Sequence, residues 1–177
     1  DIPSPGFKID PCESLLFVGS CFADAIGQRF LEEKFRAIVN PYGVMYNPAS
    51  ILHTVRRLAT DTADLKSVKV AFLTLGTNHV YRLRETGEIV DNCQKRPQAL
   101  FHEEELSVDE CADYLRQAID VLRGQNPEMH VVLTVSPIRY RKYGYHGSQL
   151  SKATLLLAAA RSGADYFPAY EIVNDEL

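Results

Sequence analysis

The sequence predicts an α/β protein in which helices sandwich a mainly parallel sheet of about five strands. Two observations lead to this fold class. Short apolar runs rich in β-branched residues alternate along the chain with segments whose apolar residues have helical spacing. These runs are apolar at nearly every position, which is typical of parallel strands covered on both faces. Strands that alternate with helices favour a parallel sheet with helices packed against it.

Five segments are expected to form the strands of this sheet. Three are strong because each is a bounded apolar run, namely Leu15–Gly19, Val68–Leu75 and His130–Val135. Two are weaker because they are short, Ala37–Val39 and Ala164–Phe167. The five expected strands are therefore spread over almost the whole length of the chain.

Helical patterns occupy the intervals between these strands. They are expected over residues 22–35, 48–58, 108–124 and 151–160, and from Tyr170 to Leu177. Asn47 before Pro48 is a typical N-cap with proline at the first helical position, and a capping box begins the third helix at Ser107. One interval differs: Arg82–Phe101 is expected to be an irregular insertion with a hairpin turn at residues 85–88.

Length and composition indicate one domain without a nucleic-acid or membrane partner. A chain of 177 residues with 46% apolar residues can bury one sizeable core, so residues 1–177 are expected to form a single domain. The formal net charge is −4 and the basic residues are scattered, which excludes the electrostatic footprint of a nucleic-acid-binding protein. No apolar segment approaches the roughly 20 residues that a membrane span needs, and no signal-peptide pattern is found.

The cysteine pattern favours free thiols over disulfides or a metal site. The chain has four cysteines, at positions 12, 21, 93 and 111, and they form no CxxC pair and no zinc-like spacing with the five histidines. A chain of this length does not need disulfides to fold, so reduced thiols in a cytoplasm are the simplest interpretation. No metal and no other cofactor is expected.

The most informative segment is Gly19-Ser20-Cys21, where an apolar run stops at a glycine and is followed by two residues capable of nucleophilic attack. A helix is expected to begin directly after the glycine. Backbone N–H groups and the helix dipole at a helix N-terminus stabilise a thiolate or a developing oxyanion. This position favours a nucleophile, and a buried cysteine packed as a small hydrophobe is the alternative.

Further polar residues follow the other expected strands. They are Gly43, the run Gly76-Thr77-Asn78-His79, Ser136 and Arg139. Ligands bind beyond the carboxyl ends of parallel strands, so these residues are expected at one site. The N–H of Gly43 and the amide of Asn78 would supply the oxyanion donors that acyl transfer needs. The alternatives are ordinary turn residues at Gly43 and Asn78, and a structural histidine rather than a catalytic base at His79.

Several blocks of the chain resemble the GSCFA-domain family, which is named after the pentapeptide found here at residues 19–23. The blocks run in one order over almost the whole chain, at residues 19–23, 40–48, 74–77, Asn92-Cys93 with Lys95, 135–137, 151–153 and 166–171. The family is regarded as a relative of SGNH/GDSL-type hydrolases. The resemblance therefore implies a three-layer αβα sandwich with a flavodoxin-like sheet, and cleavage or transfer of esters, often acetyl groups on carbohydrates. It also makes Asn92 a site candidate.

The resemblance implies roles for individual residues. SGNH enzymes carry their serine two positions after the glycine that ends the first strand. Counted from Gly19, that position holds Cys21, so Cys21 is the expected nucleophile and Ser20 the second choice. Gly43 would match the second SGNH block, and Asn78 the third, where it would complete the oxyanion hole.

The chain departs from the family pattern at three places. Gln94 and Tyr140 stand where relatives often carry histidine, and the sequence contains no Asp-x-x-His motif, which supplies the SGNH base. In relatives this motif would follow the segment 166–177, so the single domain is expected to lack its C-terminal part. His146, in an expected glycine-rich loop, is the other base considered, with a solvated loop histidine as the alternative.

Two functions follow from these residues. The first is an SGNH-like acyl hydrolase (esterase or deacetylase) or acyltransferase that acts on a small-molecule or carbohydrate ester. The second is a non-catalytic module on the same fold that binds a ligand or a carbohydrate. A nucleotide-binding domain is disfavoured, because the segment 19–22 lacks a glycine-rich phosphate loop.

Overall fold

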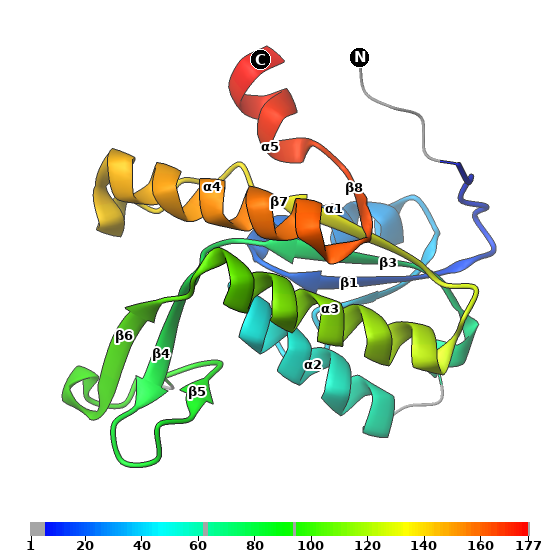
Figure 1. Cartoon of the computed structure of the whole chain (residues 1–177). Coiled ribbons are helices and arrows are strands. Elements are labelled where there is room, and N and C mark those ends of the chain that lie inside the picture. The colour runs from blue at the N-terminus through cyan, green and yellow to red at the C-terminus, as the bar shows by residue number, and fades with distance from the viewer. Residues whose placement is uncertain (1–5, 62–63, 94, 177) are drawn as a thin grey trace.

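The computed structural model describes residues 6–61, 64–93 and 95–176 and has a five-stranded parallel sheet at its centre (Figure 1). The strands are β1 (Ser14–Gly19), β2 (Arg36–Val39), β3 (Val68–Leu75), β7 (His130–Val135) and β8 (Asp165–Tyr166). They pair in the order β2-β1-β3-β7-β8, and every pair is parallel. Counted in chain order within this sheet, this is the 2-1-3-4-5 order of flavodoxin-like folds.

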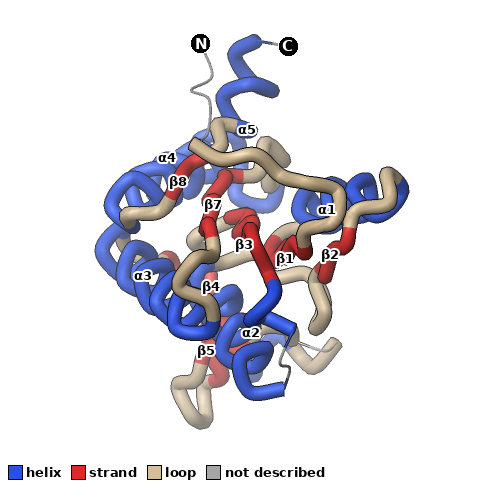
Figure 2. Tube along the Cα trace, turned by 90° about the vertical axis from the view of Figure 1, so that its right-hand side faces the viewer, coloured by secondary structure: helices blue, strands red, loops and turns tan. Residues whose placement is uncertain are grey.

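Helices cover both faces of the sheet, which confirms the predicted three-layer α/β sandwich. They are α1 (Cys21–Glu32), α2 (Pro48–Asp61), α3 (Val108–Gln125), α4 (Gly144–Ser162) and the short α5 (Ala169–Glu171), which continues as a π-helix over Ile172–Glu176. Helices α2, α3 and α4 share one hydrophobic core with the sheet, whereas α1 packs on the opposite face (Figure 2).

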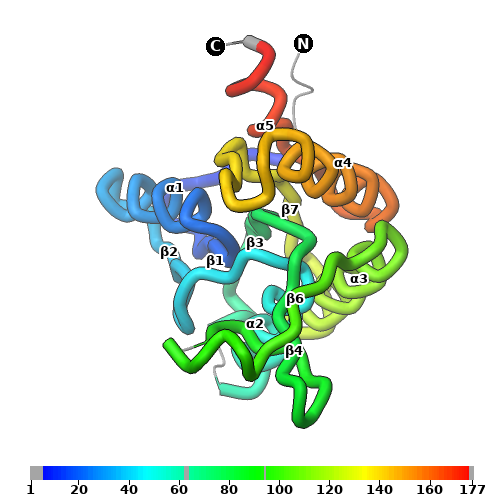
Figure 3. The backbone as a smooth tube through the Cα atoms, turned by 90° about the vertical axis from the view of Figure 1, so that its left-hand side faces the viewer, coloured from blue at the N-terminus to red at the C-terminus, as the bar shows by residue number. Residues whose placement is uncertain are grey.

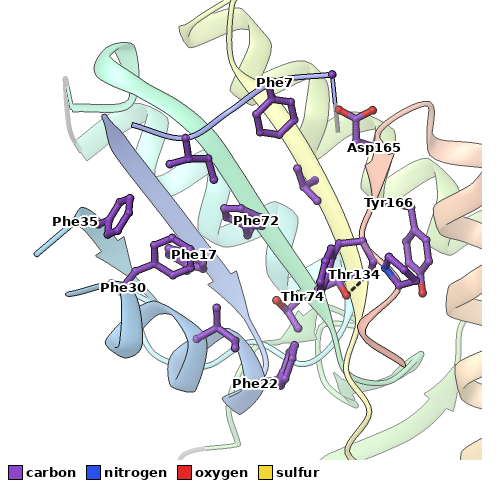
Figure 4. Close-up of a pocket in the computed structure, with 16 residues that line it drawn as sticks. Phe7, Phe17, Phe22, Phe30, Phe35, Phe72, Thr74, Thr134, Asp165 and Tyr166 are labelled. Carbon is purple, nitrogen blue, oxygen red and sulfur yellow. Dashed lines mark hydrogen bonds between the residues drawn. The ribbon is translucent and has the colours of Figure 1, made fainter. Parts of the chain in front are cut away.

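The two faces of the sheet are covered unequally. On the face of α1, the strand residues Phe17 and Phe72 pack against Phe30 of α1, and Phe7 of the N-terminal segment stacks on His130 of β7. An apolar groove of about 780 Å³ remains open there, with Phe22 and Thr74 near one end (Figure 4). The groove is therefore an exposed part of a face that α1 covers only in part.

A second, antiparallel sheet forms at the two ends and in the middle of the insertion that the sequence left irregular. It contains β4 (His79–Leu83), β5 (Ile89–Val90) and β6 (Phe101–Glu105) in the order β5-β4-β6. The hairpin turn at residues 85–88 is confirmed, since the Leu83 N–H donates to Glu88 O at 2.9 Å. The expectation of irregular structure holds for residues 84–88 and for the described residues of 91–100, apart from a 3-10 turn at Gln98–Leu100, and fails where Arg82 finds cross-strand partners in the acidic strand β6.

Most predicted elements agree with the structure, and the differences lie at helix ends. Strands β3 and β7 have the predicted bounds, and the Ser107 capping box begins α3 as predicted. Helix α1 ends at Glu32 rather than near Phe35, because Lys34 takes a positive φ of 69° and turns the chain toward β2. Helix α4 begins at Gly144 instead of at residue 151.

Further predictions concern single residues, a membrane span and a metal site. His146 lies exposed in the first turns of α4, so its expected place in a loop is wrong. All four cysteines are free thiols, whereas Gln94 lies outside the described residues. Within the described part of the chain, no helix is long and apolar enough to cross a membrane, and no three His, Cys, Asp or Glu side chains are grouped to hold a metal ion.

Candidate functional site

The candidate site lies where β1 ends and α1 begins, next to the end of β3. Gly19 has a φ of 144°, and a Cβ atom there would overlap the backbone of Thr74, so only glycine permits this approach of the two strands. The Gly19 N–H donates to Asn40 Oδ1 at 2.9 Å, and its carbonyl accepts from the Met45 N–H at 2.8 Å. The loop after β2 is thereby fixed against the end of β1, at the switch point where flavodoxin-like sheets bind ligands.

Ser20 and Cys21 have different environments although they are adjacent. Ser20 is fully buried and is the N-cap of α1, where its Oγ accepts from the Phe22 N–H at 3.3 Å. Cys21 is the first helical residue and its side chain is exposed. Because the Ser20 hydroxyl is used as a cap, Cys21 is the member of the pair that a substrate can reach.

A buried lysine from α4 reaches the same end of the sheet. The side chain of Lys152 is 1% exposed, and its Nζ donates to Gly76 O, directly after β3, at 2.7 Å. Burial lowers the pKa of Lys152 to about 8, and a negative charge on Cys21 acts in the opposite direction. Lys152 and Cys21 thus lie at the same end of the sheet, where β3 and β1 end.

Two tyrosines complete this cluster. The Nζ of Lys152 lies 5.2 Å from the ring centroid of Tyr140, which in turn meets Tyr46 edge to face at 6.0 Å. Burial, followed by a negative charge on Cys21, raises the pKa of Tyr46, and burial raises that of Tyr140. Lys152 contacts Tyr140, and Tyr140 contacts Tyr46; together with Cys21 at the same end of the sheet, we call these residues the Cys21 cluster.

Neighbouring loops hold the Cys21 cluster in place. Figure 3 shows the loop after β2 and the start of α4 on the side of the molecule where α1 begins. The N–H groups of Gly76 and Thr77 both donate to Tyr46 O at 2.8 Å. Ser151 of α4 accepts from the Asn78 N–H at 3.0 Å, one residue before Lys152. Helix α4 and the loop after β2 therefore fix the β3–β4 connection from two sides.

The two predicted oxyanion donors have other partners in this structure. The Gly43 N–H donates to Asn40 O at 2.9 Å, within the turn that follows β2. The Asn78 side chain is buried, and its Nδ2 donates to Leu106 O at 2.8 Å. Their place in the oxyanion hole stays a prediction.

The remaining site candidates lie apart from the Cys21 cluster or support the loops around it. His79 is buried in β4, stacked on Tyr143 at 3.6 Å, and burial lowers its pKa although Glu105 and Glu103 oppose this. Ser136 is buried after β7, and its Oγ accepts from the Ile138 N–H. Arg139 is exposed and donates to Asn174, and Asn92 is exposed after β5.

Sequence reasoning missed three members of the cluster as site residues. Tyr46 and Lys152 lie within the blocks of residues 40–48 and 151–153 that carried the family resemblance, and Tyr140 was noted only as a substitute for histidine. A lysine in an otherwise Leu- and Ala-rich helix was the available signal, because lysine is almost never fully buried without a partner.

The comparison with known protein families concerns almost the whole chain. The GSCFA family matches residues 14–64 and 56–177, which together include every residue of the Cys21 cluster. The chain belongs to the GSCFA family. The resemblance expected from the sequence blocks is thereby confirmed, and the cluster lies within the part of the chain that this family defines.

Solved structures are similar to this GSCFA protein in fold. Thirteen chains of solved structures match it, and one crystal structure has a TM-score of 0.50 at 12% sequence identity. That alignment covers 90% of this chain and 78% of the other. At this identity the likeness concerns the fold alone. No curated protein matches the sequence.

Proposed function

We propose that this GSCFA protein is an SGNH-like acyl hydrolase or acyltransferase with Cys21 as its nucleophile, acting on an ester such as an acylated carbohydrate. The observation that carries the proposal is the exposed thiol at the first residue of α1, at the switch point of a flavodoxin-like sheet. Ser20, the competing nucleophile, is buried and occupied as a helix cap.

The reaction follows from this position. The Cys21 thiolate attacks the ester carbonyl, a C–S bond forms, and the C–O bond to the leaving alcohol breaks. Water then cleaves the acyl thioester in a hydrolase, or a second alcohol takes the acyl group in a transferase. In the first turn of α1 the Phe22 N–H is bound to Ser20 Oγ, and the Cys21 N–H is the group that we expect to donate to the developing oxyanion. Tyr46, which is 37% exposed, offers an aromatic surface for the alcohol part of the substrate.

The test compares Cys21→Ala with Ser20→Ala on aryl acetates and acetylated sugars. We expect Cys21→Ala to lose at least 99% of the turnover, and mass spectrometry of the wild type to detect an acyl group on the peptide that contains Cys21. Ser20→Ala should keep most of its turnover and lose about 1 kcal/mol of stability, because it removes a helix cap. Cys12→Ala, at the other end of β1, is the matched control. Full turnover in Cys21→Ala would refute the proposal.

A binding module without turnover is the second candidate, and one observation favours it. Gly43 and Asn78 already donate to Asn40 and Leu106, and among the described residues no histidine interacts with Cys21. Titration calorimetry with an acetylated oligosaccharide separates the candidates. Binding without product release, unchanged in Cys21→Ala, would support the module and exclude the hydrolase.

A further inference from the structure

Asn40, the first residue after β2, has an unusual backbone conformation for a buried residue. Its φ of 39° lies in the left-handed region, and the residue is only 8% exposed. Two other non-glycine residues of the described chain have a positive φ, Lys34 and Lys95, and both are exposed. A left-handed backbone costs free energy in a residue with a Cβ atom, so a buried residue keeps it only where its surroundings fix it.

Hydrogen bonds hold Asn40 from three sides. Its backbone N–H donates to Phe17 O of β1 at 2.8 Å, and its carbonyl accepts from the Gly43 N–H of the following turn at 2.9 Å. Its side-chain Oδ1 accepts from the Gly19 N–H at 2.9 Å, and its Nδ2 donates to Asp24 Oδ1 at 3.4 Å. Asn40 therefore joins the end of β1, the first turn of α1 and the turn after β2.

The two side-chain contacts of Asn40 lie on either side of Cys21 in the sequence. Gly19 is two residues before Cys21, and Asp24 is three residues after it, in the first turn of α1. The pairing of β1 with β2 ends at Phe17, so the Gly19 N–H lies beyond it and finds its acceptor in the Asn40 side chain. A carboxamide suits both contacts, because Gly19 offers a donor and Asp24 an acceptor.

The turn that leads to Cys21 is thereby fixed from two directions. On the side of β3, Gly19 packs directly against the backbone of Thr74, and the Ser20 N–H donates to Thr74 O at 3.2 Å. On the side of β2, the Asn40 side chain holds the Gly19 N–H. Removal of the Asn40 side chain would leave the turn anchored by β3 while its contact toward β2 is lost.

We propose that Asn40 is a positioning residue of the candidate site, whose side chain ties Gly19 to Asp24 and so fixes the orientation in which α1 presents Cys21 to a substrate. For its effect on turnover, this inference rests on the proposed function. Asn40 acts through the turn and not on the reacting atoms. A displacement of a reacting group by about 1 Å is enough to lower a rate about 100-fold, so these contacts can decide the rate.

The first test compares Asn40→Gly with Asn40→Asp in the turnover of aryl acetates. Glycine adopts the left-handed backbone without strain, so Asn40→Gly removes the side-chain contacts and keeps the backbone bonds. We expect kcat to fall at least 20-fold and KM to stay within threefold, because only the nucleophile is misplaced. Asn40→Asp keeps the acceptor for the Gly19 N–H, so its kcat should be at least five times that of Asn40→Gly.

The second test needs no substrate. Iodoacetamide alkylates exposed thiols, and peptide mass spectrometry gives the rate at Cys21 relative to that at Cys12, which is also exposed. This ratio should fall at least threefold at pH 8 in Asn40→Gly, because the N-terminal N–H groups of α1 then support the thiolate in a less favourable geometry. It should return to within twofold of the wild type in Asn40→Asp. A merely structural asparagine would leave the ratio unchanged.

Lys34→Gly is the matched control. Lys34 also has a left-handed backbone, with a φ of 69°, but it is exposed and lies in the turn between α1 and β2. This substitution makes the same backbone change away from Cys21. It should leave kcat, KM and the alkylation ratio within twofold of the wild type.

Each outcome decides for or against the positioning role. Folded Asn40→Gly with wild-type kcat and alkylation ratio would overturn it, and so would equal losses in Asn40→Gly and Asn40→Asp. Should Asn40→Gly not fold, Asp24→Ala removes one of the two contacts, and kcat should fall at least threefold. An alkylation ratio that depends on Asn40 in a protein without ester turnover would remove the proposed function and leave the positioning role. Turnover that needs Cys21 and survives Asn40→Gly would do the reverse.

Discussion

Two lysines ten residues apart in sequence meet opposite environments in this protein. Lys142, just before α4, is exposed, and its Nζ contacts both carboxylate oxygens of Glu103, at 2.9 and 2.7 Å, together with the Tyr81 hydroxyl. Partial burial opposes its charge, but Glu103 and Tyr81 outweigh burial and raise its pKa. Lys152 is buried without a carboxylate, and its pKa falls to about 8.

The difference between the two lysines shows what decides whether the pKa of a lysine is raised or lowered. A carboxylate partner holds the proton on Lys142 and makes that lysine a structural tie between the second sheet and α4. Burial without such a partner lowers the pKa of Lys152 and favours its neutral form. The same residue type therefore holds its proton firmly in one region and releases it more easily in the other.

The largest effect that we expect from this comparison is the pH dependence that Lys152 gives to the stability of the protein. Between about pH 8 and 10.5 the folded protein binds fewer protons at Lys152 than the unfolded chain does, so this residue makes stability rise with pH. Between pH 7 and 10.5, the free energy of unfolding of the wild type should increase by about 3 kcal/mol relative to that of the Lys152→Met variant. Urea unfolding of both proteins at a series of pH values measures this gain.

Lys142→Met provides the opposite sign. The raised pKa of Lys142 contributes stability that is fully present below about pH 10.5 and is lost as the pH rises through the folded value. The wild type should therefore lose its advantage over Lys142→Met in alkaline solution. Parallel pH curves for the two variants would show that the two environments do not differ as described.

The next effect concerns added volume in the Cys21 cluster. A Cβ atom on Gly76 would lie 2.5 Å from the Tyr140 hydroxyl and 3.1 Å from Tyr46 O. Gly76→Ala should therefore cost about 2 kcal/mol of stability, since one of the two tyrosines must move. It should also lower the alkylation rate of Cys21. Thermal unfolding and iodoacetamide labelling measure the two changes.

Gly124→Ala is the matched control for this substitution. A Cβ atom on Gly124, inside α3, meets no atom within 4 Å. The variant should be up to about 1 kcal/mol more stable, because alanine favours the helix over glycine. Equal stability of the two alanine variants would mean that the cluster is not packed as tightly as these distances indicate.

The smallest effect concerns only the surroundings of Lys142, where Glu103 is its carboxylate partner. Glu103→Gln removes the carboxylate that contacts Lys142 and the Tyr143 hydroxyl, and should cost about 1 kcal/mol. Partial burial would raise the pKa of Glu103, but hydrogen bonds from Lys142 and Tyr143 lower it, so the cost should be present above the usual pKa of a glutamate and vanish as the pH falls through the lowered folded value. Alkylation of Cys21 and ester turnover should not change. A loss of either would connect the two regions.

The fold could be predicted from local patterns where burial was one-sided or complete. Strands β3 and β7 match their predicted bounds because continuous β-branched runs in a sheet covered on both faces leave no other interpretation. The second sheet was missed because β6 contains three glutamates in a row, a composition that disfavours strands until cross-strand partners such as Arg82 are present. The start of α4 was missed because Gly144 and Gly147 are poor helix formers.

The sequence by itself determined the position of Cys21, the proposed nucleophile. The apolar run of β1, the glycine at its end and the capping serine place Cys21 at the first residue of α1, and each of these signals is local. Only the tertiary structure decided what surrounds the thiol. Lys152 lies on a helix distant in sequence, and its burial against Gly76 and Tyr140 depends on how α4 packs beside β3. A lysine's pKa depends on that solvation and on its charged neighbours, which no local pattern contains.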